Sequence, residues 1–175
     1  VRLRPLEFVG ASVIRVEVFG KSVGLPLGLQ SDAIADDQIS ASSQSPEGPA
    51  KCARLGCAGV WRPDPTDDHA TLTVKLTGRA LLTGIATMGS GLVDAYDSTE
   101  SVAMSSRTDN RRTGGEGSIG VGFENEVDAW PAAYYVEVST NGESWRLVRH
   151  FEGNSDSTTL ATRIFADVSD RAHSA

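Results

Sequence analysis

The sequence predicts an all-β domain, a β-sandwich or flattened barrel, and three observations support this prediction. The chain has 175 residues, which is about the length of one domain, and its 18 glycines favour frequent turns. Several short segments alternate apolar and polar residues, as a strand with one buried face does. Long stretches of helix formers are few. We therefore expect packed sheets joined by turns.

The first twenty residues predict a hairpin. Residues 1–5 alternate in polarity and stop at Pro5. Residues 12–20 place Val16 and Val18 on one face and charged side chains on the other. This period of two is typical of a half-buried strand.

Further strands follow along the chain at regular intervals. They are predicted at residues 38–42, 71–76, 82–87, 134–139, 145–149 and 162–165. Asn141-Gly142 stands between two of them and signals a hairpin turn, because both residues tolerate positive φ. Trp61, Trp130 and Trp145 are interpreted as core residues.

The charge balance excludes some classes of partner. The chain has 16 Lys and Arg against 23 Asp and Glu, so its net charge is -7. Nucleic acid and anionic membranes reward a basic face, so binding to either through bulk charge is not expected. No apolar run is long enough for a membrane-spanning helix. The chain starts without Met and without a signal peptide, so we expect it to be a piece of a longer precursor.

Two cysteines, Cys52 and Cys57, stand five residues apart with Gly56 between them. A small disulfide loop is predicted, which would place the protein in an oxidising compartment. Two free thiols are the alternative. A zinc site is not expected, because the three histidines are scattered along the chain.

Residues 90–129 form a Gly-, Ser- and Asp-rich stretch with eight acidic residues and three arginines. A loop of this length in a small domain is usually functional, although a solvated insertion without a ligand is an equal alternative.

No motif favours catalysis. The spaced glycines at 115–120 lack the preceding strand and following helix of a dinucleotide site. Asp67-Asp68-His69 is explained by a polar turn as well as by a metal contact. Since no nucleophile elbow is present either, we do not expect an enzyme.

Several motifs taken in order resemble the discoidin family, also known as the coagulation factor 5/8 C-type domain. They are LPLGLQS at 25–31, ADDQISASS at 35–43, ARL at 53–55, VWRP at 60–63, TGIATMG at 83–89, YYVEVSTNGESW at 134–145 and FEGNSD at 151–156. The resemblance implies one discoidin-like β-sandwich over residues 1–175, a jelly-roll-like distorted barrel with binding loops at one end. It also implies a non-catalytic adhesion module that is secreted or part of a cell-surface ectodomain.

The order of the strands departs from the family. Residues 1–20 resemble its C-terminal strands, yet they stand first. The chain is therefore interpreted as a circular permutant or a window cut across tandem repeats. We expect these strands to fill an open slot in the sheet of their own molecule or of a neighbour, which gives a monomer or a strand-swapped dimer.

The resemblance places the binding loops at residues 44–59, 90–129 and 152–161. The predicted ligand is a cell-surface glycan or protein, contacted by Lys51, Arg54, Leu92, Tyr96, Met104, Arg107, Arg111 and Arg112. Phospholipid is a disfavoured alternative because the acidic loop would repel anionic lipid, and a structural repeat of a tandem array is another. No cofactor is expected, apart from calcium held by Asp94, Asp97 and Glu100.

Overall fold

The computed structural model describes residues 1–20, 26–78, 80–91 and 128–165. Within these ranges the chain forms mainly strands, with two short 3-10 helices, η1 (Asp36–Gln38) and η2 (Ala50–Ala53). The strands are β1 (Arg2–Val9), β2 (Arg15–Gly20), β3 (Ile39–Ala41), β4 (Leu72–Val74), β5 (Leu82–Met88), β6 (Trp130–Val138), β7 (Arg146–Glu152) and β8 (Ala161–Ile164). Neither helix in these ranges is long and apolar enough to span a bilayer.

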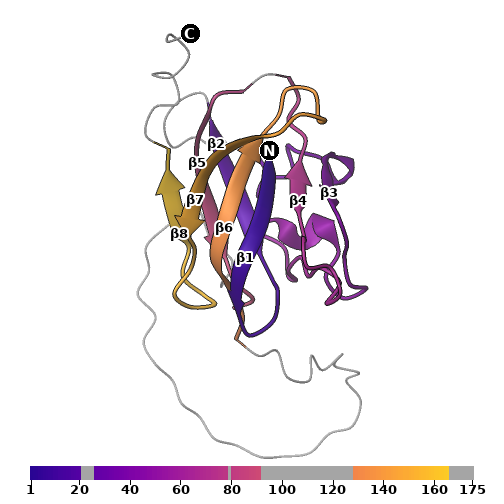
Figure 1. Cartoon of the computed structure of the whole chain (residues 1–175), viewed down its shortest axis with the longest axis vertical. Coiled ribbons are helices and arrows are strands. Elements are labelled where there is room, and N and C mark those ends of the chain that lie inside the picture. The colour runs from indigo at the N-terminus through magenta and orange to yellow at the C-terminus, as the bar shows by residue number, and fades with distance from the viewer. Residues whose placement is uncertain (21–25, 79, 92–127, 166–175) are drawn as a thin grey trace, which may run out of the picture.

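The strands build two antiparallel sheets (Figure 1). One has the order β3-β4-β1-β6-β7 and the other the order β2-β5-β8. Buried side chains of both sheets meet in one core, among them Leu3 and Tyr134 from the first sheet and Val16 and Ile85 from the second. The predicted all-β sandwich is thus confirmed.

The predicted hairpin at residues 1–20 is wrong, because β1 and β2 belong to different sheets. β1 lies between β4 and β6, whereas β2 pairs with β5. Pro5 does not end β1, since the register to β6 shifts directly after it and the strand continues to Val9. At such a bulge the strand can continue although proline has no backbone N–H to donate to the neighbouring strand.

The prediction of one exposed face on β2 also needs correction. Arg15 and Glu17 are both only 2% exposed, although they alternate with the buried Val16 and Val18. Loop segments cover this face, and their backbone groups form hydrogen bonds with the two charged side chains. Sequence periodicity could not show this cover, because the covering segments lie 12 to 76 residues away along the chain.

Trp61 is the largest side chain that is fully buried, which confirms its predicted place in the core. Its indole Nε1 donates to the backbone oxygen of Ser43 at 3.0 Å, so burial leaves no polar atom of the ring unpaired. Trp130 and Trp145 are only half-buried, so the interpretation of all three as core residues holds for Trp61 alone.

The turn between β6 and β7 lies at the predicted Asn141-Gly142 position. Gly142 has the expected positive φ of 79°. Asn141 acts differently, through its side chain: its Oδ1 accepts the backbone N–H groups of Glu143 and Ser144 at 3.0 and 2.9 Å. Trp145 closes the turn by donating Nε1 to the Gly142 oxygen at 3.1 Å.

Candidate functional site

In the described part of the chain, the bases of the loops predicted to bind ligand lie at one end of the sandwich, the lower end in Figure 1. The first is the segment between β3 and β4. The second leaves β5 through residues 89–91 and returns to β6 at residues 128–129. The third connects β7 to β8, and its Ser157 oxygen accepts the Gly91 N–H at 3.0 Å. The second and third loops are therefore joined at their bases.

Arg15 holds the base of the second loop from inside the protein. Its guanidinium donates to the backbone oxygen of Gly89 through Nε at 3.0 Å and Nη2 at 2.7 Å, and Nη2 also donates to the Gly91 oxygen. Ser90 then closes the base, because its N–H donates to the Ala129 oxygen at 2.8 Å and its hydroxyl accepts the Ala129 N–H at 3.0 Å.

Asn154 holds the third loop in a comparable way. It is 6% exposed, and its amide donates to the backbone oxygens of Thr87 at 3.0 Å and Thr159 at 2.6 Å. Its Oδ1 accepts the Thr87 hydroxyl at 2.8 Å. One side chain thus ties the third loop to β5.

Asp156 shapes the tip of the third loop. Its Oδ1 accepts the backbone N–H groups of Thr159 at 2.6 Å and Thr158 at 2.9 Å. These hydrogen bonds, the one from Thr159 foremost, lower the pKa of Asp156 from 3.8 to about 2. The carboxylate therefore stays charged at any physiological pH.

Arg54 supports the first loop from inside. It is 6% exposed, and its guanidinium donates to the backbone oxygens of Leu29 at 2.7 Å and Ile34 at 2.6 Å, and to Asp36 Oδ1 at 2.8 Å. The structure thus gives Arg54 a supporting position instead of the surface position that a ligand contact implies. Lys51, in contrast, is exposed on the same loop, and its role as a ligand contact stays a prediction.

Glu17 completes this support from β2. Its carboxylate accepts the backbone N–H of Leu29 at 3.1 Å and that of Gln30 at 2.7 Å. Leu29 is therefore bound on both sides, by Glu17 through its N–H and by Arg54 through its oxygen.

Cys52 and Cys57 are free thiols in the structure, so the predicted disulfide is not formed there. The two thiols are nevertheless neighbours that influence each other's ionisation. Burial, with a further contribution from Cys57, raises the pKa of the Cys52 thiol to about 11. A protonated thiol is a weak nucleophile and metal ligand, so Cys52 is unreactive near neutral pH.

The remaining predicted contacts fall outside the described residues. They are Leu92, Tyr96, Met104, Arg107, Arg111 and Arg112 for the ligand and Asp94, Asp97 and Glu100 for calcium. These assignments stay predictions. Among the described residues, no three His, Cys, Asp or Glu side chains are grouped as a metal site would require. Asp67 instead accepts the hydroxyls of Ser42 and Ser43, both at 2.6 Å.

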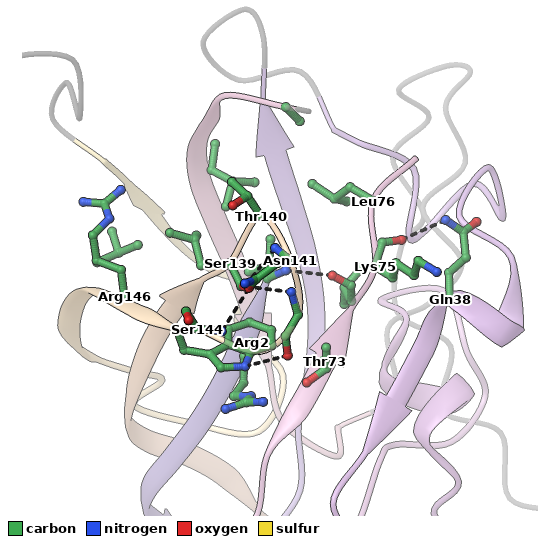
Figure 2. Close-up of a pocket in the computed structure, with 18 of the residues that line it drawn as sticks. Arg2, Gln38, Thr73, Lys75, Leu76, Ser139, Thr140, Asn141, Ser144 and Arg146 are labelled. Carbon is green, nitrogen blue, oxygen red and sulfur yellow. Dashed lines mark hydrogen bonds between the residues drawn. The ribbon is translucent and has the colours of Figure 1, made fainter. Parts of the chain in front are cut away.

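A groove of about 1220 Å³ lies at the opposite end of the sandwich, near the N-terminus (Figures 1 and 2). We call it the distal groove. Its walls come from the start of β1, the segment around β3 and β4, the turn between β6 and β7, and the beginning of β7. The lining residues used below are Arg2, Asp37, Thr73, Lys75, Thr140, Asn141, Ser144, Trp145, Arg146 and Phe165.

The distal groove has an excess of positive charge. Arg2, Lys75 and Arg146 line it from three directions, against one carboxylate, Asp37, among the described lining residues (Figure 2). Sequence reasoning missed this site, since its cations come from three separate strands or loops. The turn signal at Asn141-Gly142 was the only part that the sequence made visible.

Comparison with known proteins supports the interpretation of the fold. Human neuropilin-2 is 32% identical over 145 residues, covering 78% of this chain and 12% of the relative. Dog coagulation factor VIII is 27% identical over 176 residues, covering 91% and 6%. The non-catalytic subunit of the venom prothrombin activator omicarin-C from Oxyuranus microlepidotus is 28% identical over 155 residues, covering 82% and 8%. No family model matches the chain.

The fold places the chain in the β-sandwich class, and these relatives suggest a non-catalytic binding module. All three relatives carry discoidin domains. The chain belongs to the discoidin, or factor 5/8 C-type, family, as its motifs predicted. The relatives are secreted or cell-surface proteins, which confirms the predicted extracellular location. The chain spans only 6 to 12% of the length of the three relatives.

Proposed function

We propose that this domain is an extracellular recognition module that binds a cell-surface glycan or protein through the loops at one end of the sandwich. One observation carries the proposal: buried polar side chains form hydrogen bonds that hold the bases of these loops. Arg15 fixes the second loop and Asn154 the third, both through backbone oxygens. Burying such groups lowers the free energy of unfolding unless they are fully hydrogen-bonded. Their pairing with the loop bases therefore favours one fixed position of these bases.

The charge of the second loop favours a protein or glycan over lipid. Residues 90–129 carry eight acidic residues and three arginines, which gives this segment a charge of 3 − 8 = -5. Such a segment repels anionic lipid headgroups and suits a basic protein surface, or a glycan bound through calcium. Calcium held by Asp94, Asp97 and Glu100 belongs to this proposal.

The test compares binding of the intact domain to cells and to a glycan array with that of two variants. One replaces residues 92–126 by a short Gly-Ser linker, and the other is Lys51→Ala. The matched control is Arg149→Ala, because Arg149 is also an exposed cation and lies on β7 away from the loops. We expect the linker variant to lose binding, Lys51→Ala to weaken it several-fold, and the control to bind normally.

Two results would contradict the proposal. If the intact domain binds phosphatidylserine vesicles more tightly than it binds cells that expose no phosphatidylserine, the module is a membrane-adhesion domain. If neither cells nor glycans bind before or after the loop replacement, the domain serves as a structural repeat. Adding a calcium chelator to the same assays shows whether binding depends on the predicted calcium site.

A further inference from the structure

We propose that the distal groove is a second binding site, for an oligosaccharide that carries sulfate or carboxylate groups. The groove lies at the end of the sandwich opposite to the described bases of the loops of the proposed function, so it is a separate candidate site (Figure 1). Its volume of about 1220 Å³ exceeds that of most small-molecule pockets, which leaves room for several sugar units.

The charge of the groove favours an anionic ligand. Three cations, Arg2, Lys75 and Arg146, line it with one carboxylate, Asp37. The chain as a whole carries -7, so its long-range field repels anions. An anionic ligand would therefore be drawn to this end of the molecule by a local group of cations and not by the net charge.

Two of these cations are available to a ligand. Lys75 and Arg146 are exposed, and within the described part of the chain neither side chain lies in an ion pair. Figure 2 shows them on opposite sides of the groove. A ligand that carries anionic groups at intervals could contact both.

Arg2 is held in place before a ligand arrives. Its guanidinium carbon lies 3.7 Å from the centre of the Trp145 ring, and its Nη1 lies 3.9 Å from Glu137 Oε2. Stacking on an aromatic ring fixes the plane of a guanidinium, so less conformational entropy is lost when its N–H groups bind an oxyanion. A sulfate or carboxylate matches this planar fork in geometry.

The uncharged groups favour a sugar over an acidic peptide. The hydroxyls of Thr73, Thr140 and Ser144 make no hydrogen bond to another side chain or backbone group in the described ranges, and they act as both donors and acceptors. The half-buried rings of Trp145 and Phe165 add apolar surface to the lining, with one face of Trp145 covered by Arg2 and one face of Phe165 stacked on Phe151. Hydroxyl-rich, ring-shaped units use both kinds of group at once.

The test measures, by isothermal titration calorimetry, binding of a sulfated hexasaccharide of alternating glucosamine and uronic acid. The same sugar without sulfate and a deca-glutamate peptide are the comparison ligands. The variants are Arg146→Ala and the double variant Lys75→Ala/Arg146→Ala. Arg149→Ala is the matched control, because it removes one exposed arginine from the same strand without touching the groove. All the substituted side chains are exposed, so the fold should be retained.

We expect Arg146→Ala to weaken binding of the sulfated sugar several-fold and the double variant to weaken it about tenfold or more, because each loses charge-assisted hydrogen bonds. The control should change affinity less than twofold. Replacement of residues 92–126 should leave this binding intact, which separates the groove from the loop site. Equal losses in Arg146→Ala and Arg149→Ala, preferential binding of the peptide, or no binding by the intact domain would each overturn the proposal.

Discussion

At the scale of residues, a few buried polar side chains connect distant parts of the chain through hydrogen bonds. Arg15, Glu17, Arg54 and Asn154 are all at most 6% exposed, and all bind backbone groups of loops. Their residue types were visible in the sequence, but their burial was not. A charged residue that alternates with apolar ones in a strand looks exposed until another segment covers it.

Asn154 offers a direct measure of what one such connection contributes. Asn154→Ala removes three hydrogen bonds and leaves the buried hydroxyl and backbone oxygen of Thr87 without this partner, whereas Thr159 is exposed and can bind water instead. We expect the free energy of unfolding to fall by about 3 kcal/mol, since each unpaired buried polar group costs on the order of 1–3 kcal/mol. Urea unfolding followed by fluorescence measures the change.

The control is Ser155→Ala at the neighbouring, exposed position, which should alter stability by less than about 0.5 kcal/mol. A loss at Asn154→Ala no larger than that of the control would mean that the third loop is not held by this side chain.

At the scale of elements, most strands lie where polarity and turn signals predicted them. The prediction for residues 82–87 matches β5 (Leu82–Met88), and that for residues 162–165 matches β8 (Ala161–Ile164) within one residue. β1 and β6 are longer than predicted. β1 passes Pro5 through a bulge and pairs with β6 as far as Trp130, so each strand stabilises the extension of the other. A period-two pattern cannot show such pairing across 120 residues.

The base of the second loop is bound by Arg15, which donates hydrogen bonds to the Gly89 and Gly91 oxygens. In Arg15→Met the apolar stem stays buried, but the donors to the Gly89 and Gly91 oxygens are lost. We expect faster hydrogen exchange at the amides of Ser90, Gly91 and Ala129, which are bonded at this base. Hydrogen exchange with mass spectrometry measures it.

Arg4→Met is the comparison, because Arg4 lies over the ring of Tyr135 and contacts neither loop base. It should leave exchange at residues 89–91 unchanged. If both variants accelerate exchange over the whole domain to the same extent, Arg15 contributes to global stability only and not to this base in particular.

At the scale of the whole molecule, the first residues complete the larger sheet. β1 occupies its centre, between β4 and β6, and β2 pairs with β5 in the other sheet. The open slot expected from the family resemblance is thus filled by residues 1–20 of the same chain in this structure. That these residues are displaced C-terminal strands of the family, in a permuted or tandem arrangement, stays a prediction.

The acid stability of the whole domain follows from its turn carboxylates. Hydrogen bonds from neighbouring hydroxyl and N–H groups lower the pKa values of Asp64, Asp67 and Asp156, the last from 3.8 to about 2. A group with a lowered pKa in the folded state stabilises it above the pKa of the unfolded state. This contribution is lost as pH falls from about 4 to about 2, because the unfolded chain binds protons first.

We therefore expect the midpoint of thermal unfolding to fall as the pH drops below about 4. Scanning calorimetry between pH 2 and 7 measures it. In Asp156→Asn, whose amide oxygen still accepts hydrogen bonds but does not titrate, the decline should be shallower than in the unmodified domain. An identical decline in both would show that Asp156 does not contribute to it.

The sequence by itself determined the β-sandwich class, most strand positions, the turn at Asn141-Gly142 and the family, because these depend on local polarity, turn chemistry and ordered motifs. Only the tertiary structure decided that β1 and β2 separate into two sheets, that Arg54 faces inward and that the two thiols are unbridged. It alone also brought Arg2, Lys75 and Arg146 into one groove. The physical reason is that burial and charge clustering are set by contacts between segments far apart in the chain, and a local pattern carries no information about them.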